Sequence, residues 1–154
     1  MDSVTDNEDL AARLGQTDLF AGVSPKVLKQ LAGGGEIQEF AAGDVVTAEG
    51  AAVGGLAPFS RTGVFFHLAI EGSGEVRKGG QSVATVGPGD YFGELSLIDG
   101  EPRSADVIAG DGGLRTFAMN KWSFETLLEE HPEVAVPMLH VLAARLRADE
   151  ARHS

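Results

Sequence analysis

Residues 89–105 read GDYFGELSLIDGEPRSA, and this stretch decides how the chain is interpreted. A strand is expected to end at Phe92, after which Gly93 lets the backbone approach a ligand closely. Residues 94–98 can form one short helical turn, whose first N–H groups would face an anion. Pro102 then directs the chain into a further strand. The stretch therefore has the form of a loop that holds a small anionic ligand.

Three side chains in this stretch carry the chemistry. The guanidinium of Arg103 can grip a phosphate with paired N–H donors, and the Ser104 hydroxyl can add another. The carboxylate of Glu94 would repel a phosphate, but it can accept hydrogen bonds from ligand hydroxyls. Ordinary alternatives exist: Arg103 paired with Glu101 or Glu94 on the surface, a solvated Glu94, or a serine that merely starts a strand. The functional interpretation predicts a small anion with a neighbouring hydroxyl.

Short alternating segments separated by glycine occupy residues 37–119. The candidate strands are Ile37–Phe40, Val45–Ala48, Val64–Ile70, Gly74–Arg77, Gln81–Val86, Ser104–Ile108 and Leu114–Met119. The turns expected between them are Gly43-Asp44, Gly72–Gly74, Gly79-Gly80, Gly87–Asp90 and Gly110–Gly113. Many short strands with such turns predict a β-sandwich or a barrel-like roll.

Three details of this region stand out. Residues 43–46 read GDVV and residues 89–92 read GDYF. This similarity indicates that the same Gly-Asp turn leads into a strand at both places. Residues 50–63 fit no element and are interpreted as a long loop. His67 lies in an apolar strand and is expected to be a packed or rim histidine.

Helices are expected on both sides of the strands. Leu10 and Leu14 indicate an N-terminal helix, and Ser24-Pro25 is typical of a second helix start, with serine as N-cap and proline at the first helical position. That helix should end at Gly33–Gly35.

The C-terminal part of the chain also has helical periodicity. Asn120 can cap a helix that is broken at His131-Pro132. The apolar residues of this helix are Trp122, Phe124, Leu127 and Leu128. A last helix is expected to begin at Pro137, because proline inside a helix removes a hydrogen bond. Its apolar face consists of Met138, Leu139, Leu142 and Leu146.

Composition limits the class of protein. The 154 residues suffice for one domain, and 21 glycines favour many turns over a helical bundle. There is no cysteine, which excludes disulfides and thiolate metal sites. The net charge of −11 argues against general nucleic-acid binding. The acidic N-terminus is unlike a signal peptide and no apolar run approaches the ~20 residues of a membrane span, so the expected compartment is the cytoplasm.

The stretch at 89–105 resembles the phosphate-binding cassette of cyclic nucleotide-binding domains, the sensors of catabolite activator proteins, cyclic-nucleotide-dependent kinases and gated channels. That cassette reads Phe-Gly-Glu-Leu-Ala/Ser-Leu and, a few residues later, Pro-Arg-Ser/Thr/Ala-Ala, which residues 92–97 and 102–105 match closely. Residues 19–24 also resemble the helical entry of the family, and residues 42–45 its first turn.

The resemblance implies a mainly β fold: a double-stranded β-helix, or jelly-roll-like β-roll, with N-terminal helices and a C-terminal helix pair. Residues 1–154 would form one stand-alone domain. Its parts would be a helical entry at 10–34, the β-roll at 36–119 and C-terminal helices at 120–151.

Site roles are likewise implied by the resemblance. Arg103 would bind the cyclic phosphate, and Glu94 the ribose 2′-hydroxyl. Ser104 would touch the phosphate or the base. The backbone at Gly93 and Leu95 would add donors. The remaining ligand-binding positions are Phe92, Ser96, Ala105, Val83 and Ala84, with Val76 beside them. Asp106 departs from the family, where a neutral residue is common, and a carboxylate there could weaken phosphate binding.

The predicted function is a non-catalytic sensor that binds cyclic AMP in preference to cyclic GMP. It would signal through its C-terminal helices to a protein partner or a second copy, without cofactor, metal, DNA or membrane. One alternative is a protein-interaction module with a vestigial pocket. A cupin-like metal enzyme is disfavoured because the histidines, at 67, 131, 140 and 153, are scattered. A transcription factor is disfavoured because the chain is acidic and stops just after the long helix.

Overall fold

The computed structural model describes residues 6–47, 65–94 and 105–153. The chain forms two compact units, one of residues 34–124 and one that combines residues 1–33 with 125–154. The predicted loop at 50–63 lies outside the described residues.

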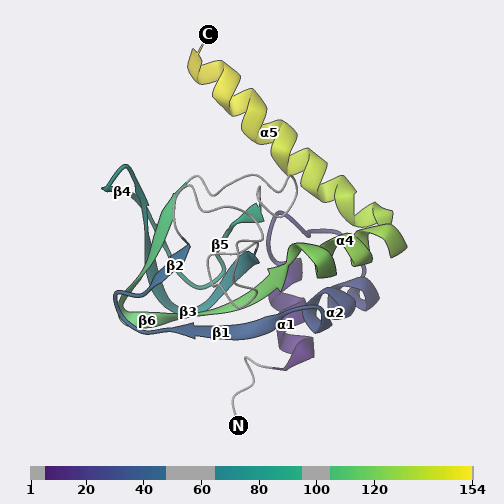
Figure 1. Cartoon of the computed structure of the whole chain (residues 1–154). Coiled ribbons are helices and arrows are strands. Elements are labelled where there is room, and N and C mark those ends of the chain that lie inside the picture. Colours follow the sequence, from purple (N-terminus) through teal and green to yellow (C-terminus); the bar gives the residue numbers. More distant parts are fainter. Residues whose placement is uncertain (1–5, 48–64, 95–104, 154) are drawn as a thin grey trace. The chain divides into compact units, whose positions relative to one another are not determined.

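The unit at 34–124 contains an antiparallel sheet (Figure 1). Its strands are β1 (Glu36–Phe40), β2 (Val45–Thr47), β3 (Phe65–Lys78), β4 (Gln81–Val86), β5 (Tyr91–Phe92) and β6 (Asp106–Asn120). They are ordered β1-β6-β3-β4, while β2 pairs with β6 and β5 pairs with β3. The predicted mainly β fold, with helices before and after the strands, is confirmed.

Two of the predicted turns are wrong, because Gly72–Gly74 lies inside β3 and Gly110–Gly113 lies inside β6. The pairing moves from Gly72 opposite Leu114 to Gly74 opposite Ala109, so β6 accommodates residues 110–113 as a bulge. Gly72 has a φ of +85°, and a Cβ there would lie 2.2 Å from the Gly113 carbonyl oxygen. These glycines bend two paired strands and bring their backbones together, instead of ending the strands.

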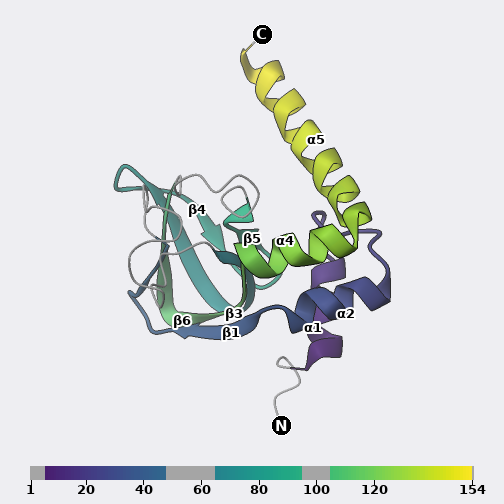
Figure 2. The ribbon, with the colours of Figure 1, turned by 45° about the vertical axis from the view of Figure 1, so that its right-hand side comes forward.

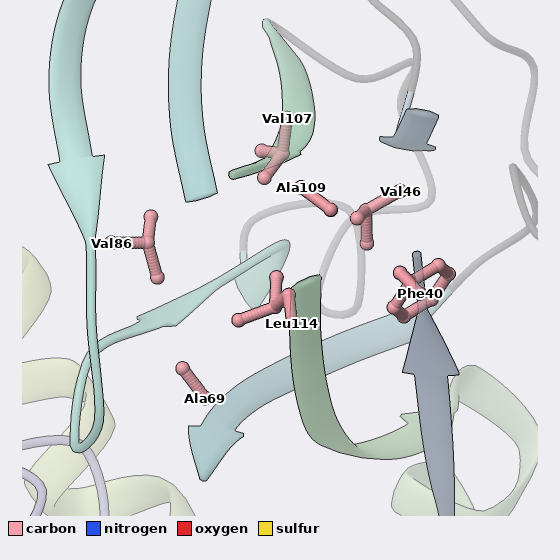
Figure 3. Close-up of a cluster of buried hydrophobic side chains, with 7 residues drawn as sticks. All are labelled: Phe40, Val46, Ala69, Val86, Val107, Ala109 and Leu114. Atoms are coloured by element: carbon pink, nitrogen blue, oxygen red, sulfur yellow. The ribbon is translucent and has the colours of Figure 1, made fainter. Parts of the chain in front are cut away.

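One face of the sheet carries a cluster of buried hydrophobic side chains, and we call it the inner face. Its buried side chains come from β1, β2, β3, β4 and β6 and point toward one another: Phe40, Val46, Ala69, Val86, Val107, Ala109 and Leu114 (Figure 3). Val76 and Phe92 pack against this cluster. Successive strand residues point to opposite faces, so the register assigns every other residue of each strand to the inner face.

The N-terminal helices are α1 (Asn7–Gly15) and α2 (Pro25–Gly33), which pack on each other (Figure 2). The predicted start of α2 is confirmed, because the Ser24 hydroxyl accepts a hydrogen bond from the Val27 N–H at 3.4 Å. The predicted end at the glycine run is also confirmed.

The C-terminal helices are α4 (Lys121–Glu130), a 3-10 turn η2 (Pro132–Val134) and α5 (Ala135–His153). The Asn120 side chain caps α4 as predicted, accepting from the Ser123 N–H at 2.8 Å. The expected start of the last helix at Pro137 is wrong. The helix begins at Ala135, and Pro137 falls in its first turn, where a missing N–H costs no intrahelical bond.

The apolar faces of these helices agree with expectation in part, since Phe124 and Leu127 of α4 are buried. Trp122 is 84% exposed, so it is not part of a buried face of α4. In α5, Met138 is buried, while Leu139 and Leu146 are 61% and 65% exposed. Among the described residues, no helix is both long enough and apolar enough to cross a membrane.

Candidate functional site

The turn before the cassette is fixed by its own hydrogen bonds and by β3. The Asp90 carboxylate accepts from the Gly87 N–H at 2.9 Å, and Gly89 has a φ of +94°. The backbone of Ala69 donates to the Asp90 carbonyl at 2.8 Å and accepts from the Gly89 N–H at 2.9 Å. The chain therefore enters β5 from a rigid turn attached to the sheet.

The turn before β2 uses the same bonds, which confirms the predicted internal echo. The Asp44 carboxylate accepts from the Ala41 N–H at 2.9 Å, and Gly43 has a φ of +84°. Ala109 of β6 donates to the Asp44 carbonyl at 2.8 Å and accepts from the Gly43 N–H at 2.9 Å. Two Gly-Asp turns thus attach two short strands, β2 and β5, to the two longest strands.

The first three cassette residues follow this turn. Phe92 ends β5, and its half-buried ring stacks on the His67 imidazole with centroids 4.9 Å apart and planes 13° apart. Gly93 has a φ of +85°, a conformation that side chains with a Cβ rarely adopt. Glu94 is helical and half-buried. The expected change from strand to helix at Gly93 is confirmed as far as Glu94.

Four predicted site residues, Leu95, Ser96, Arg103 and Ser104, lie outside the described residues. The description resumes at Ala105, which is half-buried and directly precedes β6.

The neighbouring Asp106 points away from the core. Val107 belongs to the inner face, so Asp106 is on the opposite face, where it lies in register with Arg77 of β3. Arg77 also forms an ion pair with Glu75. The residue that departs from the family pattern therefore lies opposite Arg77 on the outer face of the sheet.

The positions predicted to contact base and sugar are on β3 and β4. Val76 pairs with Ala84 and also with Val107, so all three share the inner face. Val83 falls at a bulge, has no register partner on β3 and is 55% exposed. Ala84 is exposed as well. The strand is thus open to solvent even on its inner face, except at Val86.

The predicted site residues fall into two groups along β3. The group that includes Phe92 is on or next to β5, which pairs with residues 67–68 of β3. The group that includes Val83 and Ala84 is on β4, which pairs with residues 74–78 of β3. The inner face joins them, because both Phe92 and Val76 pack against the same core cluster.

A separate groove of about 460 Å³ contains none of the predicted site residues. It is lined by Glu39, Phe40, Ala41, Glu71, Gly72, Gly112, Gly113, Leu114 and Arg115. The Arg115 guanidinium lies 3.3 Å from the Glu39 carboxylate and 3.7 Å from that of Glu71, so its charge is already balanced by protein groups.

A polar pair on the inner face was not assigned a role from sequence. His67 and Thr116 are both fully buried, and the His67 Nδ1 lies 3.0 Å from the Thr116 hydroxyl oxygen. The prediction that His67 is packed is confirmed. Its contact with the cassette residue Phe92 depends on strand pairing, and the only local signal was a histidine inside an apolar strand.

The described residues contain no group of three His, Asp or Glu side chains that could hold a metal ion. The buried His67 has aromatic and hydroxyl neighbours, whereas a metal centre would surround it with further nitrogen or carboxylate ligands.

Comparison with known proteins identifies the family of this β-roll. The sequence model of the cyclic nucleotide-binding domain matches residues 37–131. A cAMP-dependent protein kinase regulatory subunit from Mycosarcoma maydis is 32% identical over 118 residues, which cover 71% of this chain and 21% of the relative. A CRP-like cAMP-activated global transcriptional regulator from Mycobacterium tuberculosis is 28% identical over 141 residues, or 91% of this chain and 58% of the relative.

The same similarity is present in three dimensions. The catabolite activator protein of Thermus thermophilus superimposes with a TM-score of 0.73 at 26% identity, covering 88% of this chain and 61% of that one. The chain thus spans between a fifth and three fifths of the length of these proteins. The family match includes the Gly-Asp turns, β5 and the cassette in one segment. The chain belongs to the cyclic nucleotide-binding domain family.

Proposed function

We propose that this chain is a non-catalytic regulatory domain that binds a cyclic nucleotide through the cassette, with cyclic AMP favoured over cyclic GMP. The observation that carries the proposal is the conformation at Gly93, a positive φ between a strand residue and a helical residue, within a segment that matches the family. The two relatives described above are named for cAMP, which supports that choice of ligand.

The proposed site divides the ligand among several elements. Arg103 and Ser104 bind the cyclic phosphate, together with backbone donors at Gly93 and Leu95. Glu94 accepts from the ribose 2′-hydroxyl. The base and sugar pack on apolar positions of β3 and β4. Phe92, Ser96, Ala105, Val76, Val83 and Ala84 complete the proposed site.

The position of Asp106 on the sheet is compatible with an anionic ligand. The Asp106 carboxylate is on the outer face opposite Arg77, so it does not add negative charge to the inner face. The exposure of Val83 and Ala84 supports a role in ligand contact, because burying such apolar surface favours binding.

We further propose that occupancy is relayed through the C-terminal helices. In α5, Val136, Leu139 and Leu146 are at least half exposed, which provides apolar surface for a protein partner or for a second copy. Residues 1–154 would then work as one sensor domain in the cytoplasm, with no cofactor besides the nucleotide and no DNA contact from this chain.

Titration calorimetry of the intact chain with cyclic AMP and with cyclic GMP tests this proposal. We expect saturable one-to-one binding of both ligands, with the tighter dissociation constant for cyclic AMP. Absence of binding for both would reject the sensor function and favour an interaction module. Tighter binding of cyclic GMP would reject only the ligand preference.

A further inference from the structure

His67 is a histidine in a place where an apolar residue would be expected. It is fully buried in β3 and belongs to the inner face, since Ala69, two residues on, is part of the core cluster. Burying an imidazole costs free energy unless its ring nitrogens are hydrogen-bonded, and the Thr116 hydroxyl, 3.0 Å from Nδ1, offsets this cost at that nitrogen. A leucine or isoleucine would fill similar space without needing this hydrogen bond. Packing volume alone therefore does not account for a histidine at this position.

The pairing of the strands directs this imidazole at the cassette. His67 lies in register with Phe92 of β5, so the two side chains share the inner face. Their rings are nearly parallel, at 13°, with centroids 4.9 Å apart. Phe40 of β1 also contacts the His67 imidazole edge-on, with ring centroids 6.0 Å apart and planes at 66°. The imidazole thus contacts two aromatic rings and lies within hydrogen-bond distance of the Thr116 hydroxyl.

The short strand β5 makes this contact important. It has two residues, each with one register partner on β3, so few ladder bonds fix its end. Gly93 follows at once and permits many backbone conformations. The ring of Phe92 is therefore the last side-chain anchor before Glu94, and its stack on His67 lies at the point where the chain leaves the sheet.

We propose that His67, oriented by Thr116, is the positioning residue of the cassette: through Phe92 it holds Gly93 and Glu94 where Glu94 can meet the ligand hydroxyl. The nucleotide part of this inference rests on the proposed function. The local part, the ordering of residues 91–94 by the stack, applies to the unliganded chain and is testable without any ligand.

Hydrogen exchange of the unliganded chain tests the local part. His67→Leu removes the ring while keeping the bulk, whereas His67→Phe keeps the stacked ring. Val86→Ala serves as a control, because it weakens the same core from β4. We expect residues 91–94 to exchange at least about tenfold faster in His67→Leu than in Val86→Ala, and at nearly the parental rate in His67→Phe. Equal exchange in His67→Leu and Val86→Ala would overturn the proposal.

A ratio of affinities tests the nucleotide part, because a general loss of stability lowers all affinities together. The parental chain should prefer cyclic AMP over its 2′-deoxy analogue by about tenfold, the loss of one hydrogen bond. In His67→Leu we expect this ratio to fall below about threefold, in Thr116→Val to fall partway, and in His67→Phe to be restored. An unchanged ratio in His67→Leu would show a purely structural role and overturn the proposal. If the parental chain binds neither nucleotide, the proposed function fails while the exchange experiment still decides the positioning role.

Discussion

At the residue scale, two kinds of constraint meet at the cassette. Gly93 is required for its backbone, because φ is +85° between Phe92 and Glu94. In the proposed site, the charge of Arg103 would bind the phosphate and the charge of Glu94 would bind the ribose hydroxyl. The motif in the sequence was sufficient to name all of these residues, since they follow one another along the chain. The stack of His67 on Phe92 was not predictable, because the two residues are 25 positions apart in the sequence and are brought together by the pairing of β3 with β5.

Replacing the proposed phosphate-binding arginine should abolish tight binding. For Arg103→Ala we expect an intact fold and a binding free energy for cyclic AMP that is weaker by several kcal/mol. This is the cost typical of removing one member of a buried, charge-assisted hydrogen-bonded pair. Calorimetry gives the affinity, and circular dichroism checks the fold. Arg77→Ala is a matched control, because Arg77 is on the outer face beside Glu75 and should change the affinity little. Parental affinity in Arg103→Ala would show that the cassette does not hold the phosphate.

The carboxylate of Glu94 should recognise the ribose hydroxyl. We expect 2′-deoxy cyclic AMP to bind about tenfold more weakly than cyclic AMP, which corresponds to ~1.4 kcal/mol. The reason is that the deoxy ligand leaves a desolvated carboxylate without its partner. Competition titrations with the parental chain and with Glu94→Ala measure this preference, which should disappear in the variant. Equal affinity of the parental chain for both ligands would remove Glu94 from the site.

At the element scale, the strand positions were predictable and their lengths were not. The predicted strands Ile37–Phe40 and Gln81–Val86 lie within a residue of β1 and β4. The predicted turns at 72–74 and 110–113 failed because glycine has the same local signature in a turn and in a bulge. Only the register between β3 and β6, which depends on residues far apart in sequence, distinguishes the two.

The close approach of β3 and β6 at Gly72 predicts how two glycine substitutions change the free energy of unfolding. In Gly72→Ala, the added Cβ would meet the Gly113 carbonyl oxygen at 2.2 Å and the φ of +85° would also be strained. Gly80→Ala is the matched control, because its φ is +82° and no atom lies within 4 Å of the added Cβ. We expect Gly80→Ala to lower the free energy of unfolding by about 1 kcal/mol, the strain alone. Gly72→Ala should cost clearly more, by about 3 kcal/mol in total. Urea denaturation measures both, and equal losses would contradict the close approach of the strands.

At the scale of the whole molecule, the chain comprises two units with different roles in the proposal. The unit at 34–124 contains the described part of the cassette, while α5, with its exposed leucines, belongs to the unit of residues 1–33 and 125–154. A sensor must couple the two units. A ligand can shift the conformation of α5 only if it binds the alternative states of the protein with different affinity. The sequence predicted both parts from local patterns, but a coupling between them is a property of the ensemble, which no local pattern encodes.

Hydrogen exchange with and without cyclic AMP measures that coupling, because it reports the opening of each segment separately. We expect the ligand to slow exchange across residues 93–104 and also to alter it in residues 137–147 of α5, while the core strands β3 and β6 keep their rates. Pro137 supplies no amide signal, and its position in the first helical turn leaves the following turns of α5 as reporters. The Arg103→Ala variant, which should not bind cyclic AMP, is the control. If cyclic AMP still changes exchange in α5 of this variant, the change does not come from binding at the cassette. A response confined to the cassette would leave a nucleotide-binding module in which α5 takes no part in the signal.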